Sequence, residues 1–258
     1  LLEKFDVEYI ATTDDPFSDL HNHGDINGVK VRPTFRPDRC FSEGADKTTL
    51  EERLDYFVSK GCKIADHGFD NFDDTENLEW LIEKCYEKGI VLQLHFGTFR
   101  NINSDALRAI GKDSGFDVFR DFVATDALAK LLDKMNAKLG GLPKIVLYPL
   151  NDACLRAVCA ISGAFPNVLV GAAWWFNDTV SGINRQLETV SEYAVLGTNL
   201  GMLTDSRSFS SYVRFDFFRR ILASFVADKV DKGEYDEKSA IALAKDIAYN
   251  NVKEALGL

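Results

Sequence analysis

Residues 196–209 read LGTNLGMLTDSRSF, a mostly apolar run that ends in charged side chains. The part from Leu196 to Leu203 predicts a short strand, with Asp205 and Arg207 just past its carboxyl end. Side chains two positions apart on an extended segment point to the same side, so we expect these two charges to act at one place. That place is where α/β barrels carry their catalytic groups. The alternative interpretation is a strand-end loop with a surface ion pair.

The two side chains suit chemistry on a small acid. An aspartate carboxylate can ligate a metal or accept a proton, and an arginine guanidinium can hold a carboxylate through two hydrogen bonds. The stretch therefore predicts Asp205 as a metal ligand or proton shuttle, and Arg207 as an anchor for a substrate carboxylate.

Elsewhere in the chain, short apolar segments alternate with amphipathic ones. The other predicted strands span residues 7–11, 29–35, 63–65, 90–94, 144–148 and 168–172. The predicted helices span residues 49–60, 78–88, 118–139 with a break near residue 125, 153–163, 181–193, 212–232 and 237–256. Strands that alternate with helices indicate parallel βαβ units. We therefore expect the α/β class and a (β/α)8 barrel of the TIM type, although the sequence shows seven strands where a barrel needs eight.

Polar or aromatic side chains recur just after the predicted strands. They are Asp14, Asp15, Arg36, Asp66, His67, His95, Trp174, Trp175, Asp205 and Arg207. His67 is either a general acid or base, since the ordinary pKa of histidine lies near neutrality, or a structural hydrogen-bonding residue. Of Trp174 and Trp175, one is expected to face the barrel mouth, because neighbouring side chains on a strand point in opposite directions.

Composition argues against several classes of function. The net charge is −10 and no basic segment is found, which argues against a nucleic-acid partner. No apolar run approaches the ~18 residues of a membrane span, and no secretory leader is visible. The five cysteines are scattered without a CxxC pair, which favours a reduced, cytoplasmic protein and argues against a cysteine metal site.

Six motifs together carry a family resemblance. They are TTDDP at 12–16, PTFRPD at 33–38, QLHFG at 93–97 followed by Arg100, GKDSGFD at 111–117, WWFND at 174–178 and GMLTDSR at 201–207. With these motifs, nearly the whole chain resembles uronate isomerase (glucuronate isomerase), a member of the amidohydrolase superfamily. The resemblance implies a (β/α)8 barrel that isomerises hexuronates reversibly. It implies D-glucuronate with D-fructuronate, or D-galacturonate with D-tagaturonate, as the sugar acid substrates.

The resemblance also implies roles for individual residues. It implies a divalent metal, often zinc, with Asp205 and His95 as its ligands. The substrate-binding set that it implies is Arg36, Arg207, Trp174, Trp175, Arg100 and Asp117. With His67 added for its own chemistry, the predicted catalytic residues are Asp205, Arg207, Arg36 and His67.

The chain departs from the family at its start. Family members open with a strand that carries His-x-His and supplies two metal ligands, whereas residues 1–7 precede the second strand of the alignment. We therefore expect residues 1–258 to form a single barrel domain that lacks its first strand. His21 and His23 resemble the missing motif but follow a polar segment, so a solvated loop is the alternative to a metal site. The connections after Cys40 and Phe72 also look shorter than in the family.

Two other functions stay open on the sequence. One is a metal-dependent hydrolase of the same superfamily. Such a hydrolase would need a lysine at a strand end or a fuller set of histidine ligands, and this chain has only four histidines. The other is an inactive barrel remnant without metal ligands. An open barrel would leave two unpaired sheet edges that invite another chain, so a homo-oligomer is a further expectation.

Overall fold

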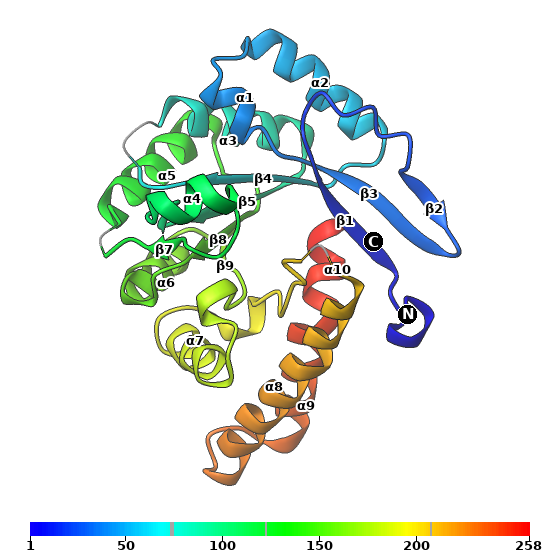
Figure 1. The fold of residues 1–258 in the computed structure, drawn as a ribbon. Helices are drawn as coiled ribbons and strands as arrows, with labels where there is room; N and C mark the ends of the chain where they lie inside the picture. The colour runs from blue at the N-terminus through cyan, green and yellow to red at the C-terminus, as the bar shows by residue number, and fades with distance from the viewer. Residues whose placement is uncertain (73–74, 122, 207) are drawn as a thin grey trace.

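The computed structural model describes residues 1–72, 75–121, 123–206 and 208–258. A parallel sheet lies at its centre, with helices packed along it (Figure 1). The strands are β1 (Tyr9–Asp14), β2 (Gly24–Ile26), β3 (Val29–Phe35), β4 (Ile64–Phe69), β5 (Val91–Phe96), β6 (Thr98–Phe99), β7 (Val118–Phe119), β8 (Ile145–Pro149) and β9 (Val168–Val170). The α-helices are α1 (Asp38–Ser42), α2 (Lys47–Ser59), α3 (Glu76–Lys88), α4 (Ser104–Ile110), α5 (Thr125–Leu139), α6 (Leu155–Ala164), α7 (Val180–Tyr193), α8 (Val213–Asp231), α9 (Glu237–Lys245) and α10 (Asn251–Leu256).

The main sheet confirms the predicted α/β class. Its strands run parallel in the order β1, β3, β4, β5, β8 and β9, and β2 pairs antiparallel with the edge of β3. The strands predicted before residue 196 are all found in this sheet. Among the described residues no ladder joins β9 back to β1, so hydrogen bonding leaves the predicted barrel open on that side.

The alternation of side chains along the strands gives the sheet two buried faces. Leu92 and Leu94 of β5 join the large outer cluster that the helices cover. Val91 of β5 and Val146 of β8 join a smaller inner cluster. Strand β8 is buried at every position, which is the pattern of a strand covered on both faces. The side chains that follow the strands are therefore presented from a rigid frame.

The segment from Leu196 to Leu203 is not a strand, and this part of the prediction is wrong. The structure has a 3₁₀ turn at Leu196–Thr198, followed by irregular backbone. Side-chain amides take the place of a ladder: Asn251 Nδ2 donates at 2.8 Å to the carbonyl oxygens of Gly197 and Asn199. With those carbonyls satisfied by an asparagine, the segment runs along the open side of the sheet without pairing as a strand.

The C-terminal helix covers the base of the inner face. Between α9 and α10 the chain forms a π-helical turn, Asp246–Asn250, and α10 lies near β1 on the open side of the sheet (Figure 1). Leu256 is buried in the inner cluster. A Cβ at Gly201 would come within 3.0 Å of the Ile247 carbonyl oxygen, so glycine is needed for this close approach.

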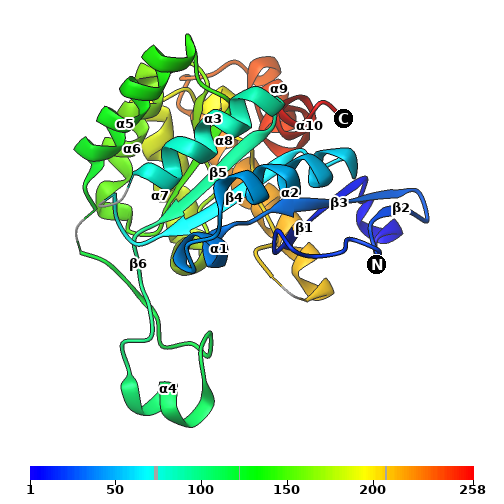
Figure 2. The same cartoon turned by 90° about the horizontal axis from the view of Figure 1, so that it is seen from above.

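An arm projects from the body after β5, and Figure 2 shows it with α4 at its tip. Strands β6 and β7 pair antiparallel at its base. The long helix predicted over residues 118–139 is therefore wrong in its first part: residues 118 and 119 pair with β6, and the helix begins at Thr125. In the part of the chain that the structure describes, no helix has the length and apolar character needed to cross a membrane.

Candidate active site

Arg36 is the hub of a charged network at the carboxyl ends of three neighbouring strands. It follows β3, and its Nε donates to Asp38 Oδ2 at 2.8 Å. Its Nη2 donates to His95 Nε2 at 3.0 Å, and its Nη1 lies 3.3 Å from Asp66 Oδ2. Burial disfavours the charge, but Asp66 and Asp38 outweigh it and keep the pKa of Arg36 above its ordinary value. The guanidinium is thus already engaged by two carboxylates.

His95 extends the network on β5. Its Nδ1 lies 3.0 Å from Asp66 Oδ1 on the adjacent strand β4. Gly68, two residues beyond Asp66, leaves room for the ring, because a Cβ there would come within 3.0 Å of His95 Nε2. The ring is held on both sides, by a carboxylate at one nitrogen and by Arg36 at the other.

His67 lies on the opposite side of β4 from Asp66, as the alternation of a strand requires. Its Nδ1 is 2.6 Å from Asp38 Oδ1, and its ring packs edge-on against Phe41 of α1. Burial would raise the pKa of Asp38, but the hydrogen bond and charge of His67, together with the charge of Arg36, outweigh burial and lower that pKa. In this position His67 supports Asp38, which in turn holds Arg36.

Asp205 approaches the same network from the loop after residue 203. Arg36 and His95 are near enough for their charges to act on it. Burial nevertheless raises the pKa of Asp205 above its ordinary value, against the opposing charges of Arg214 and His95. The residue as a whole is exposed, but its carboxylate is partly desolvated, and a carboxylate with a raised pKa is suited to proton transfer.

The two tryptophans after β9 lie differently. Trp174 is 7% exposed, and its ring meets that of His95 edge-on, with centroids 5.6 Å apart. Its indole Nε1 is buried and has no hydrogen-bond partner among the described residues. Trp175 adopts a φ of 53°, which is rare for a bulky residue, and stacks on Phe176. Strained backbone of this kind clusters at functional sites.

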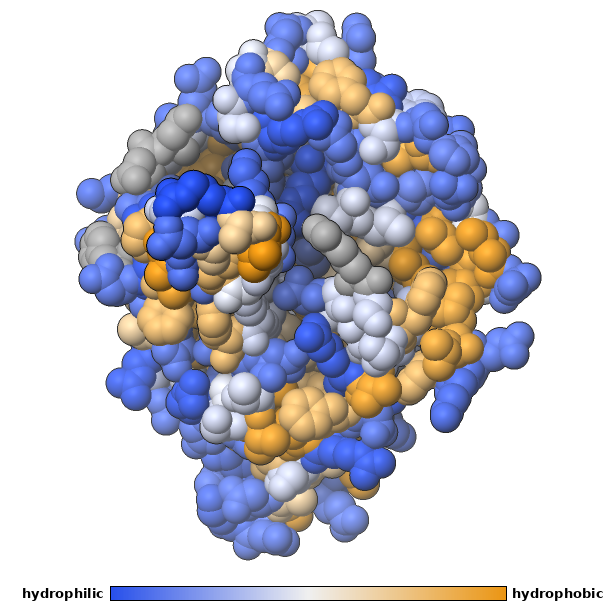
Figure 3. All heavy atoms as spheres, viewed as in Figure 1, coloured by the Kyte–Doolittle hydropathy of each residue, from blue (hydrophilic) through white to orange (hydrophobic). Residues whose placement is uncertain are grey.

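A cavity of about 190 Å³ adjoins the network. It is lined by Asp38, Gly68, Phe69, Asp70, His95, Thr98 and Arg100. Arg100 pairs across the base of the arm with Asp117, its Nη1 lying 3.1 Å from Oδ2. The structure thus places Arg100 at the cavity and Asp117 behind it. The face seen in Figure 1 is hollowed near its middle, and hydrophilic residues lie within the hollow (Figure 3).

The described residues do not complete a metal site. They contain no group of three or more histidine, cysteine or acidic side chains placed to hold an ion. The two predicted ligands, His95 and Asp205, face a site in which Arg36 already occupies His95 Nε2. His21 is exposed and pairs with Asp19, whereas His23 is half-buried with its Nε2 2.7 Å from Thr12 Oγ1, so the two do not converge on one point.

Sequence reasoning found only part of this arrangement. The structure brings together Arg36, His95, Asp205 and Trp174; Arg207 lies outside the described residues. Asp38 and Asp66 were missed as partners of Arg36, although Asp38 follows it by two positions in PTFRPD. Asp178 and Arg214, which also meet at the mouth, are distant in sequence and offered no local signal.

Comparison with known proteins identifies the relatives of this chain. A family profile described as glucuronate isomerase matches residues 1–49 and 72–256. The uronate isomerase of Caldanaerobacter subterraneus subsp. tengcongensis is 32% identical over 324 aligned positions, which take in 100% of this chain and 69% of the relative. That of Oceanobacillus iheyensis is 34% identical over 317 positions, covering 97% of this chain and 67% of the relative. Because these alignments are longer than the chain, the relatives carry additional residues within the aligned stretch.

Solved structures are similar in fold. The uronate isomerase of Thermotoga maritima superposes with a TM-score of 0.91 at 28% identity, over 99% of this chain and 69% of that protein. The glucuronate isomerase of Caulobacter crescentus gives a TM-score of 0.88 at 26% identity, over 99% and 65%. The similarity in fold therefore extends over nearly the whole of this chain.

Proposed function

Because this chain belongs to the glucuronate isomerase family, we propose that it is an aldose–ketose isomerase of hexuronates. Its substrates are D-glucuronate with D-fructuronate, and D-galacturonate with D-tagaturonate. The observation that carries the proposal is the network of Arg36, His95 and Asp66, with Asp205 beside it, at the carboxyl ends of parallel strands. The relatives named above are isomerases, which favours this activity over metal-dependent hydrolysis.

The reaction moves one proton between C2 and C1 and another between the two oxygens. It needs a group that accepts and returns a proton, a donor that polarises the carbonyl, and a hold on the distant carboxylate. Asp205 is the proposed proton acceptor, since burial raises its pKa toward the working range of a general base. The Arg36 guanidinium is the proposed donor at the carbonyl oxygen, and His95, which accepts from Arg36 Nη2, holds it in place.

Substrate binding is proposed for groups around the cavity. The indole N–H of Trp174, which has no partner among the described residues, is available to a hydroxyl or carbonyl oxygen, and Trp175 forms an aromatic wall beside it. Arg100 is proposed to contact the substrate from the cavity rim, with Asp117 setting its orientation. Arg36 is a weaker anchor for the substrate carboxylate than its residue type suggests, because Asp38 and Asp66 already neutralise it. Arg207 is therefore proposed as the main anchor.

The predicted divalent metal, with zinc as the expected ion, remains a prediction. The described residues supply Asp205 and His95 but no complete ligand set, so no step of the reaction is assigned to a metal here. Metal analysis of the purified protein, and its activity before and after a chelator, will decide whether an ion binds.

The test is direct turnover. The protein is incubated with D-glucuronate or D-galacturonate, with and without added zinc, and ketouronate formation is followed by NMR. Appearance of the ketouronate, and its absence with Asp205→Asn, is the expected result. A folded protein that gives no ketouronate under any of these conditions would identify it as the inactive remnant instead.

Cellular location and assembly are also proposals. All five cysteines are free, which supports a reducing, cytoplasmic environment. The projecting arm exposes Phe99, Ile102, Ile110 and Phe119, and large exposed apolar side chains on one element favour association with another copy. Light scattering of the purified protein will test whether it is a homo-oligomer.

A further inference from the structure

The loop that carries Asp205 is tied down by an arginine from the helix that follows it. Arg214, near the start of α8, donates from Nη1 to the carbonyl oxygen of Thr204, and the same nitrogen lies 3.5 Å from the carbonyl oxygen of Asp205. Its Nε pairs with Asp178 Oδ2 at 3.1 Å. One guanidinium thus connects the loop after β9 to the loop of the catalytic carboxylate.

Asp178 holds the Arg214 guanidinium in place. Its side chain is 10% exposed, and it follows directly on Asn177, whose Nδ2 donates to the Leu150 carbonyl oxygen at 2.8 Å. The Asn177 carbonyl oxygen in turn lies so close to Gly182 that a Cβ there would come within 3.0 Å of it.

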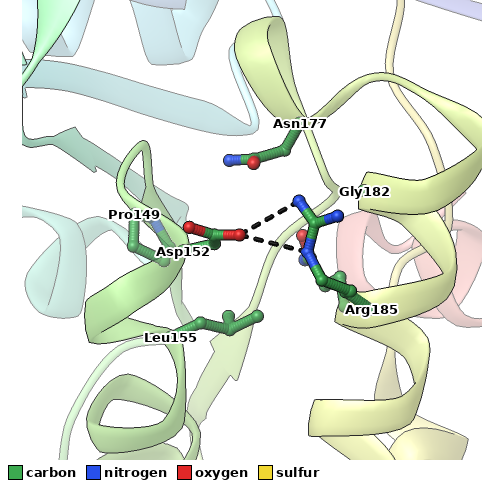
Figure 4. A pocket seen from close by; sticks show the side chains of 7 residues that line it. Pro149, Asp152, Leu155, Asn177, Gly182 and Arg185 are labelled. Carbon is green, nitrogen blue, oxygen red and sulfur yellow. Dashed lines mark hydrogen bonds and ion pairs between the residues drawn. The ribbon is translucent and has the colours of Figure 1, made fainter.

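The surroundings of this turn are tightly packed. Figure 4 shows Asn177 and Gly182 beside the ion pair of Arg185 with Asp152. The recess among these residues holds only about 10 Å³, no more than the space of one water. The turn before α7 is therefore held on several sides, and Asp178 cannot shift easily.

Asp205 needs such support because of its backbone. Its φ is 40°, in the left-handed region that non-glycine residues seldom adopt. Strained residues of this kind persist where the surrounding structure determines their conformation. The carbonyl groups of Thr204 and Asp205 flank the Asp205 Cα, so a donor that holds both restricts the backbone torsions of this one residue.

We propose that Arg214, with Asp178 behind it, is a positioning residue that aims the Asp205 carboxylate at Arg36 and His95. The inference rests on the function proposed above, in which Asp205 moves the proton. A loop free to relax from the left-handed conformation would carry the carboxylate away from the network. Misplacement of a reacting group by about 1 Å lowers a rate on the order of 100-fold, whereas substrate contacts elsewhere would be retained.

The first test is kinetic and compares four single variants. Arg214→Met removes the contacts with the Thr204 and Asp205 carbonyl oxygens and with Asp178. Arg214→Lys keeps the charge with a single donor group, and Asp178→Asn weakens the ion pair that holds Arg214. Arg220→Met is the matched control, because Arg220 pairs with Asp216 on the same helix α8.

Arg214→Met is expected to lower kcat roughly 10- to 100-fold while KM stays within about twofold. Arg214→Lys and Asp178→Asn are expected to give smaller losses of the same kind, and the control to match the wild type. The double variant of Arg214→Met with Asp178→Asn is expected to be no slower than Arg214→Met alone, since Asp178 acts through the arginine.

The second test does not depend on activity. Crystal structures of the wild type and Arg214→Met are expected to show Asp205 leaving the left-handed region in the variant while α8 keeps its place. If Asp205 stays where it is, or if kcat is unchanged, the positioning role is wrong. If the wild type shows no turnover but Asp205 still moves in the variant, the positioning role stands and the proposed isomerase activity fails. Should Arg214→Met not fold, Arg214→Lys and Asp178→Asn decide by the same two measurements.

Discussion

His95 Nε2 accepts a hydrogen bond from Arg36 Nη2 at 3.0 Å, and this contact determines where the imidazole carries its proton. A guanidinium only donates, so Nε2 is unprotonated and the proton resides on Nδ1. From there it is donated to Asp66 Oδ1, 3.0 Å away. Asp66 also faces Arg36 Nη1. One carboxylate therefore sets the tautomer of the histidine and the orientation of the arginine together.

Asp66→Asn is expected to lower kcat/KM roughly 10- to 100-fold, the range found when a carboxylate that orients a functional histidine is removed. The amide oxygen can still accept from His95 Nδ1, but the ion pair with Arg36 is lost. Ketouronate formation followed by NMR measures the rate, and ¹⁵N chemical shifts of His95 report the tautomer. Asp55→Asn is the control, because it removes only a surface pair with Lys88. Wild-type kcat/KM in Asp66→Asn would contradict the assignment.

Asp38 should make the protein acid-sensitive. His67 and Arg36 lower its folded pKa below the ordinary 3.8 despite burial. A carboxyl whose pKa is lower in the folded state stabilises the protein above its unfolded pKa, and this stabilisation is lost as the pH falls toward the folded pKa. The free energy of unfolding of the wild type should therefore exceed that of Asp38→Asn by about 1–3 kcal/mol near pH 7.

That difference should shrink progressively below about pH 4, where the unfolded chain begins to bind the proton. Urea unfolding of both proteins at pH 7, 5 and 3 measures it. A difference that stays constant from pH 7 to pH 3 would show that the Asp38 carboxylate is not stabilised by its partners.

The strands before residue 196 were predictable because apolar runs of strand length alternate with helical spacing along the chain. The strand predicted for Leu196–Leu203 failed for a tertiary reason. Its sequence suits a strand, but the structure gives it no paired neighbour, and Asn251 binds its carbonyls instead. Local pattern carries no information about whether a partner strand lies alongside.

In the candidate site, too, some residues are predictable from local sequence pattern and others only from the folded structure. Arg36, His95 and Trp174 were predictable because each ends or follows a strand, and parallel strands bring their carboxyl ends together. The direction of His67 was also readable from the sequence, since it neighbours Asp66 and must face the other way. The link from Asp178 to Arg214 was not, because it joins two loops that only the folded chain brings into contact.

Gly68→Ala should disrupt the network sterically. A Cβ at this position would come within 3.0 Å of His95 Nε2, closer than real Cβ atoms lie, so the ring must move away from Arg36. We expect kcat/KM to fall on the order of 100-fold and the free energy of unfolding to fall by about 1–3 kcal/mol. Steady-state kinetics and urea unfolding measure the two effects.

The control for this substitution is Gly163→Ala in α6. Its added Cβ would meet the Tyr193 carbonyl oxygen at an ordinary 3.5 Å, and alanine suits a helix better than glycine. Gly163→Ala should keep wild-type kinetics. If Gly68→Ala did the same, the contact between His95 and Arg36 would not matter to the reaction.

Trp174→Phe tests the unpartnered indole N–H beside His95. The substitution keeps an aromatic ring but removes a buried donor that has no partner among the described residues. Loss of one hydrogen bond to the substrate corresponds to a rise in KM of roughly tenfold, while the melting temperature should change little beyond the effect of a smaller ring. Trp80→Phe, at a tryptophan that packs on Phe41, controls for that effect and should leave KM unaltered. If KM for D-glucuronate is the same in Trp174→Phe and the wild type, the indole N–H does not bind the substrate, and its burial without a partner serves packing alone.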